Sequence, residues 1–252
     1  MIFMRILPGV LKELVKHVPT IMFHLVDWNE LMGEIPKISR RILQKEDYDA
    51  IFDNQKDYLS KLKISLRSES LSHPGGFKEL WISEKVLQLY FSQLFSPHGV
   101  FLDLRSQNFG IDAPYLLWHP TGLWIKFSPK FQEGLIHIYD GFYQNDENLY
   151  RQGLVEIGIM KEDWPAQDKD ELGQIFKTQF GSSQEGAIKF NLEDFKNSML
   201  LVANFLIKKK VTISKDFLYL GIYLVTLYSF LEESGQKLEV KNEYLKIKQA
   251  LG

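Results

Sequence analysis

The residues best placed to do chemistry lie in one short stretch, D-L-R-S-Q-N at positions 103–108. A carboxylate followed five residues later by an amide, here Asp103 and Asn108, can hold a general base and a magnesium ligand in one loop, as phosphoryl transfer requires. That chemistry needs a second metal carboxylate about ten residues farther along the chain. The chain has L-L-W-H-P-T-G at 116–122, with Pro120, which carries no charge, at the required position. The spacing therefore indicates a phosphoryl-transfer loop that lacks the second metal carboxylate.

Two interpretations of this loop remain open on the sequence alone. In one, the candidate catalytic residues Asp103 and Asn108 bind a metal ion or a ligand, and His119 acts as an acid or base. In the other, which we favour, Asp103 accepts hydrogen bonds from backbone N–H groups of the loop and Asn108 satisfies a buried carbonyl. A lone histidine is more often a hydrogen-bonded structural residue than a catalyst. The six histidines have no metal-binding spacing, so no metal site is predicted.

The candidates for ligand binding are Arg105 and three aromatic residues, Trp118, Trp124 and Phe127. Together with Phe131, the aromatic residues could line an apolar pocket for an isoprenoid or acyl chain. Aromatic residues at a junction between a loop and a helix are more often part of the core, and we favour that interpretation.

Composition excludes several classes of protein. The chain has 252 residues, of which 45% are apolar and 13% aromatic, and this suffices for the core of a globular domain. A net charge of −2 gives no field that would attract nucleic acid, and the absence of cysteine excludes a disulfide scaffold. The N-terminus has no signal-peptide pattern, so we expect a cytoplasmic protein. The longest uncharged run, at 217–231, is too short to cross a bilayer and is predicted to be a buried helix.

Hydrophobic periodicity predicts a mainly α fold in a single domain, 1–252. Residues 1–70 are expected to hold the N-terminal helices, one of them capped by Asp27. Residues 161–190 are polar and are expected to form a mobile connection, and residues 191–252 to hold three C-terminal helices.

The central part, residues 80–160, surrounds the loop. Two short β-like pieces, 99–102 and 115–117, are expected to flank the loop like a small hairpin. Serine, aspartate and an N1 proline favour helix starts. Such starts are expected at Ser83, Ser128-Pro129 and Asp146.

In this order of elements the chain resembles the UbiB (AarF-like) family of atypical kinases, which is associated with quinone biosynthesis and lipid homeostasis. The family's catalytic-loop motif is D-P-H-P-G-N-F, and F-L-D-L-R-S-Q-N-F-G at 101–110 keeps its Asp103, Asn108 and Phe109. The other matches, in the family's order, are Q-K-E-D-Y at 44–48 with Asn54, Leu116-Leu117, Gly122, Ser128-Pro129, Asn145-Asp146 and Ile157-Gly158. The resemblance implies a helical domain like the C-terminal lobe of an atypical kinase, with a small hairpin-like remnant of the catalytic loop.

The departures from the family imply a loss of catalysis. The family's nucleotide-binding lobe needs a K-x-G-Q segment, a phosphate loop and a lysine that pairs with ATP, and none of these precedes residue 45. The glutamate that would pair with that lysine falls at Lys45, a reversal of charge. Because phosphoryl transfer depends on positioning and electrostatics, the resemblance implies a catalytically inactive pseudokinase without a cofactor.

The sequence therefore favours an accessory factor that binds a protein partner or an isoprenoid-like lipid, in quinone or isoprenoid metabolism. No nucleic acid and no transmembrane segment are expected. Two alternatives stay open. One is an enzyme of unknown type with a site around Asp103, Arg105, Asn108 and His119. The other is a peripheral membrane adaptor with an amphipathic helix at 5–18, whose basic residues could face anionic headgroups.

Overall fold

The computed structural model describes residues 12–14, 16, 18–44, 48–68 and 77–251. Their fold is mainly α with small sheets, as predicted. The α-helices are α2 (Trp28–Gln44), α3 (Tyr48–Lys61), α4 (Leu80–Phe95), α5 (Pro129–Gln144), α6 (Glu147–Glu156), α7 (Ala166–Lys177), α8 (Leu192–Lys208), α9 (Lys215–Ser234) and α10 (Val240–Leu251). The 3-10 turns are η2 (Thr20–His24), η3 (Ser106–Asn108) and η4 (Thr178–Phe180). The strands are β1 (Ile64–Leu66), β2 (Val100–Phe101), β3 (Phe109–Asp112), β4 (Tyr115–Trp118), β5 (Trp124–Ile125), β6 (Ile188–Lys189) and β7 (Lys237–Leu238).

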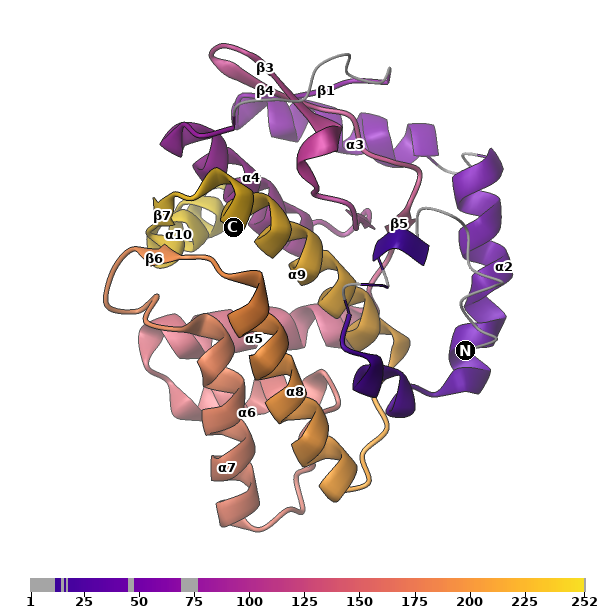
Figure 1. The fold of residues 1–252 in the computed structure, drawn as a ribbon, viewed down its shortest axis with the longest axis vertical. Helices are drawn as coiled ribbons and strands as arrows, with labels where there is room; N and C mark the ends of the chain where they lie inside the picture. The colour runs from indigo at the N-terminus through magenta and orange to yellow at the C-terminus, as the bar shows by residue number, and fades with distance from the viewer. Residues whose placement is uncertain (1–11, 15, 17, 45–47, 69–76, 252) are drawn as a thin grey trace.

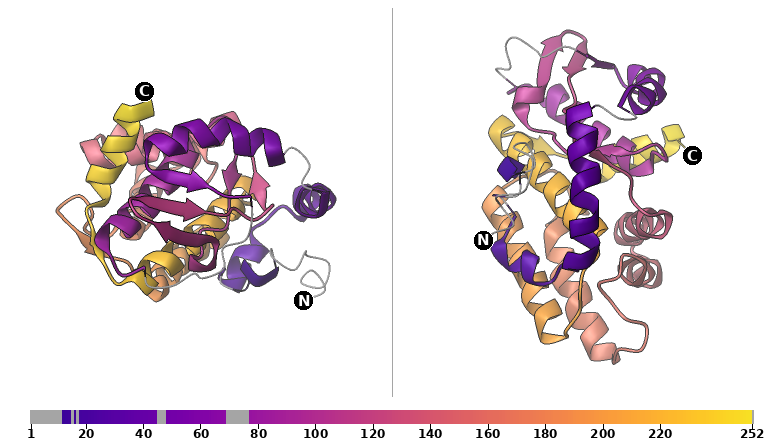
Figure 2. Two further views of the ribbon diagram at one scale, coloured as in Figure 1. Left: turned by 90° about the horizontal axis from the view of Figure 1, so that it is seen from above. Right: turned by 90° about the vertical axis from the view of Figure 1, so that its right-hand side faces the viewer.

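The elements are arranged along the long axis of the molecule. Figure 1 shows β1, β3 and β4 at one end and α7 and α8 at the other, with α9 running between them. The side view in Figure 2 shows α2 lying lengthwise along one side of the molecule. The loop at 103–108 therefore lies near the sheet end, whereas α7 and α8 build the opposite end.

Helix α9 forms the centre of the core, as predicted for residues 217–231. Of its 20 residues, 14 are buried, because apolar side chains occupy all of its faces. Ser214 caps the helix by accepting a hydrogen bond from the backbone N–H of Phe217 (3.3 Å), and Gly235 ends it in the left-handed conformation. In the described part of the chain, no helix is both long enough and apolar enough to cross a membrane.

The strands around the loop pair differently from the prediction. Segments 99–102 and 115–117 do contain β2 and β4, but these two strands belong to different sheets. β4 pairs antiparallel with β3, which directly precedes it, and parallel with β1. β2 pairs antiparallel with β5 and sets Val100 opposite Ile125. The hairpin forms between β3 and β4 because only a short turn separates them.

Helices α5 and α6 pack closely against each other. Ser128 precedes Pro129 at the start of α5, and Asp146 caps α6 by accepting hydrogen bonds from two backbone N–H groups, both as predicted. Three glycines, Gly134, Gly141 and Gly153, lie where the backbones of α5 and α6 touch. A side chain at any of them would meet the neighbouring helix at less than 3.0 Å.

Two expectations about the elements need correction. The helix predicted to start at Ser83 begins at Leu80, and Ser83 is fully buried inside it, because apolar Trp81 and Ile82 extend the helix toward its N-terminus. Residues 161–190, expected to be a mobile connection, contain α7, η4 and β6, since Leu172 and Phe176 give α7 a buried face.

The remaining helix predictions agree with the structure where it describes them. Three helices, α8, α9 and α10, occupy residues 191–252. Asp27 accepts a hydrogen bond from the backbone N–H of Asn29 (2.9 Å) at the start of α2. The helix predicted at 5–18 falls mostly on residues outside the described ones.

Candidate functional site

The loop at 103–108 holds its carboxylate in an internal ion pair. Asp103 is 1% exposed, and the Arg105 guanidinium donates from Nε to Oδ1 (2.8 Å) and from Nη2 to Oδ2 (2.7 Å). The backbone N–H of Arg105 also donates to Oδ1 (3.2 Å). These contacts raise the pKa of the guanidinium, chiefly through its hydrogen bonds to Asp103. Both carboxylate oxygens therefore already have donors, and the pair is bidentate.

The other loop residues are likewise used by the fold. The Asn108 side chain donates from Nδ2 to the carbonyl of Asp103 (3.1 Å), so it satisfies a buried carbonyl. The backbone N–H of Leu104 donates to Thr226 Oγ1 (3.2 Å), and this hydroxyl donates to the carbonyl of Leu102 (2.8 Å), which ties the loop to α9. The Asn108 bond is the one expected from the sequence, whereas Asp103 accepts from one backbone N–H and from the Arg105 guanidinium, which was not expected.

His119 lies next to the loop without facing its carboxylate. Its backbone N–H donates to the carbonyl of Asn108 (2.8 Å), and its Nδ1 lies 3.0 Å from the carbonyl of Arg67. The structure thus brings Asp103, Asn108 and His119 together through hydrogen bonds to the backbone carbonyls of Asp103 and Asn108. Among the described residues, no three histidine, aspartate or glutamate side chains are grouped so that they could hold a metal ion.

The aromatic candidates for ligand binding lie in the core. Trp118 is fully buried and makes an edge contact with Phe101 (5.6 Å between ring centroids). Trp124 and Phe127 are 5% and 3% exposed, and Phe127 stacks on Phe131. None of them lines the cavities described below.

ATP with magnesium is expected to leave the thermal stability of the protein unchanged. The carboxylate that would serve as base is held by Arg105, and Pro120 replaces the metal carboxylate. A ligand at 100 times its Kd would add about 2.7 kcal/mol to the free energy of unfolding. Differential scanning fluorimetry with millimolar ATP and magnesium, against magnesium alone, measures this. A rise in Tm of several degrees with ATP would contradict the expectation.

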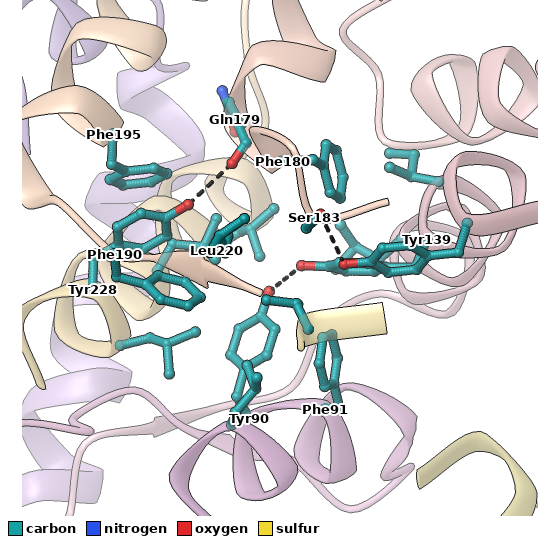
Figure 3. Close-up of a pocket in the computed structure, with 18 of the residues that line it drawn as sticks. Tyr90, Phe91, Tyr139, Gln179, Phe180, Ser183, Phe190, Phe195, Leu220 and Tyr228 are labelled. Atoms are coloured by element: carbon teal, nitrogen blue, oxygen red, sulfur yellow. Dashed lines mark hydrogen bonds between the residues drawn. The ribbon is translucent and has the colours of Figure 1, made fainter. Parts of the chain in front are cut away.

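A different place in the molecule forms a cavity of about 60 Å³. It lies among α4, α5, α7, η4, β6, α8, α9 and α10, so no single segment of sequence builds it. Figure 3 shows side chains from these elements converging on it. Its aromatic lining residues include Tyr90, Tyr139, Tyr143, Phe180, Phe190, Phe195 and Tyr228. We refer to it as the aromatic cavity.

Tyrosine hydroxyls are the main polar groups of the aromatic cavity. The hydroxyls of Tyr90 and Tyr139 lie 2.7 Å apart, and Tyr228 donates to the carbonyl of Gln179 (3.0 Å), as Figure 3 shows. Burial raises the pKa of Tyr90, Tyr139 and Tyr228 above the ordinary phenol value, so all three stay protonated at neutral pH. In the Tyr90–Tyr139 pair one hydroxyl accepts and keeps its own proton, which can be donated to a bound molecule.

A second hollow of about 360 Å³ adjoins the aromatic cavity and shares Gln179, Phe190 and Tyr228 with it. Its lining is more polar and includes Asn191, Asp194, Lys189 and Lys237. We refer to it as the vestibule. A mainly apolar cavity and a more polar hollow thus lie side by side.

Sequence reasoning missed this site. Tyr90 and Tyr139 occupy inward-facing positions of their helices, and residues at such positions ordinarily fill a core. The useful signal was the apolar set Phe176, Phe180 and Phe190 inside a stretch that otherwise looks polar. Such residues need a surface to pack against, and that surface is the aromatic cavity.

No protein-family model matches the chain, and a search of curated proteins finds no significant match. The functional conclusion therefore rests on the geometry of the loop and of the aromatic cavity.

Proposed function

We propose that this protein is a non-catalytic binding protein that holds a small amphipathic, lipid-like molecule in the aromatic cavity. The observation that carries the proposal is the lining of that cavity by aromatic side chains from several distant segments, with a few hydroxyl groups among them. Pockets for small molecules have this composition: apolar and aromatic walls with a small number of polar groups that fix orientation. The sequence favoured either a protein partner or a lipid ligand, and the cavity supports the lipid ligand.

The loop supports the non-catalytic part of the proposal. A base must reach the proton that it abstracts, but the Asp103 carboxylate is 1% exposed and bonded on both oxygens. The order of α4, β2, the loop and the β3–β4 hairpin is consistent with the proposed likeness to the C-terminal lobe of UbiB-type atypical kinases. Within that likeness we propose an isoprenoid or quinone-related molecule as the ligand.

Filling the aromatic cavity requires one of its walls to move, because about 60 Å³ holds only part of a lipid-sized molecule. The wall formed by η4 and the turn after it is held by side-chain contacts: Tyr228 donates to the carbonyl of Gln179, and Gln184 donates to the carbonyl of Phe142. The Phe180 ring contacts the rings of Tyr139, Phe142, Tyr143 and Phe176, and Ser183 lies 3.4 Å from the Tyr143 hydroxyl. A bound molecule would replace the contacts that this wall makes with the interior.

The proposal is tested by mass spectrometry of an organic extract of protein purified without detergent. We expect the wild-type protein to carry one main small molecule. Leu224→Trp, which adds an indole at the cavity wall, should abolish its retention, because the added ring occupies the same space. Leu201→Trp is the matched control, since Leu201 is 51% exposed on α8. Equal extracts from wild type and Leu224→Trp, or an empty wild type, would rule the proposal out.

A further inference from the structure

Two lysines lie directly opposite each other at the vestibule. Lys189 in β6 and Lys237 in β7 are cross-strand partners, and both line the vestibule. Like charges placed directly opposite in an antiparallel pair destabilise it. The neighbouring pair in the same ribbon, Ile188 and Leu238, is apolar, and Ile188 lines both hollows. The ribbon thus places two positive charges at the polar end of an apolar site.

The charges of the two lysines are not balanced by the fold. Neither has an ion pair with any residue that the structure describes, whereas Lys177, near the aromatic cavity, is bonded to Glu147 (2.6 Å). Asp194 is the one carboxylate in the lining of the vestibule, so the lining carries two positive charges and one negative charge. An anion between the two ammonium groups would remove their mutual repulsion and leave the ribbon paired.

We propose that the molecule held in the aromatic cavity is an anionic amphiphile whose carboxylate or phosphate group is bound by Lys189 and Lys237. This inference rests on the proposed function, because it requires an apolar part in the aromatic cavity. The anionic group lies in the vestibule, and the apolar chain passes Phe190 and Tyr228, which line both hollows. Specificity for charge then comes from the vestibule and specificity for shape from the cavity.

The test uses probes that share one chain and differ in headgroup: decanoate, decyl phosphate, decanol and decylamine. Isothermal titration calorimetry gives the affinity of each for wild-type protein, for Lys189→Gln/Lys237→Gln and for the control Lys196→Gln/Lys208→Gln. The control removes the same charge from α8, at positions that do not line the vestibule. Glutamine keeps a long polar side chain, so the ribbon is expected to stay folded in both double variants.

We expect decanoate or decyl phosphate to bind wild-type protein roughly tenfold more tightly than decanol, and decylamine more weakly than decanol. The vestibule variant should lose that advantage while its affinity for decanol is unchanged, and the control variant should behave as wild type. Added salt should weaken binding of the anions alone. The tighter of the two anionic probes identifies carboxylate or phosphate as the natural headgroup.

Two results would overturn the inference in distinguishable ways. If decanol binds as tightly as the anions, or if the vestibule variant keeps the preference for anions, the charge assignment fails while the proposed function stands. If none of the four probes binds, the proposed function fails together with the inference.

Discussion

Gly141→Ala is expected to lower the free energy of unfolding by at least about 3 kcal/mol. A Cβ atom at this position would lie 2.3 Å from the backbone nitrogen of Tyr150 and 2.6 Å from its Cα atom. These are backbone atoms of α6, so no side chain can rotate away to make room. The added methyl group can be accommodated only if α5 and α6 separate, and close-packed interiors do not absorb such a shift cheaply.

Urea unfolding of Gly141→Ala against wild type measures this effect. Gly33→Ala is the matched control, because nothing lies within 4 Å of a Cβ atom at Gly33 in α2. That control should be neutral or stabilising by up to about 1 kcal/mol, since alanine favours helix more than glycine does. A Gly141→Ala protein as stable as wild type would show that α5 and α6 do not touch as described.

A second glycine in the same contact gives a test of coupling. A Cβ atom at Gly153 would lie 2.6 Å from the carbonyl oxygen of Gly134 and 2.7 Å from the backbone nitrogen of Ile138. Both substitutions force the same two helices apart, so the cost of the double variant should be smaller than the sum of the single costs.

Local sequence signals predicted the parts of the fold that depend on a few neighbouring residues. Ser128-Pro129 and Asp146 mark the starts of α5 and α6 because capping and the fixed φ of proline act within one helical turn. The apolar run at 217–231 predicted a buried helix, because the length and composition of the run are enough to predict one without knowledge of distant contacts.

Contacts between distant segments could not be predicted in this way. The pairing of β1 with β4 joins Ile64 to Leu116, and nothing in either segment specifies the other. Ser83 has the residue type of a helix cap, yet it is buried within α4 because the apolar residues before it continue the helix. The aromatic cavity likewise exists only after eight elements have come together, so its lining had no local pattern.

The loop at 103–108 is the case in which spacing and structure point to different chemistry. The positions of Asp103 and Asn108 permit a metal site, and the sequence left both interpretations open. The deciding residue is Arg105, two positions after the carboxylate, whose guanidinium occupies both oxygens. A motif defined by spacing specifies only its fixed positions. In this loop Arg105, which lies between the two fixed positions, binds the carboxylate.

Breaking the Asp103–Arg105 pair is expected to have an asymmetric effect on stability. The Arg105 side chain is 22% exposed and can turn toward water when its partner is removed, whereas the Asp103 side chain is 0% exposed. Asp103→Ala should therefore lower the free energy of unfolding by about 2 kcal/mol, mainly through lost hydrogen bonds. Arg105→Met should cost about 3–5 kcal/mol, because it leaves a buried carboxylate without a counter-charge.

The double variant Asp103→Ala/Arg105→Met distinguishes this structural role from a catalytic one. Because it removes both charges, it should be more stable than Arg105→Met alone, as measured by urea unfolding. Asp112→Ala is the control: Asp112 is 70% exposed and lies 3.9 Å from Arg67, so its loss should change stability by less than about 0.5 kcal/mol.

Asp103→Asn should keep most of the stability and also bind decanol as wild type does. An Asp103→Asn protein that is fully stable but no longer binds decanol would instead place Asp103 in a binding or catalytic site, since a purely structural carboxylate affects binding only through the fold.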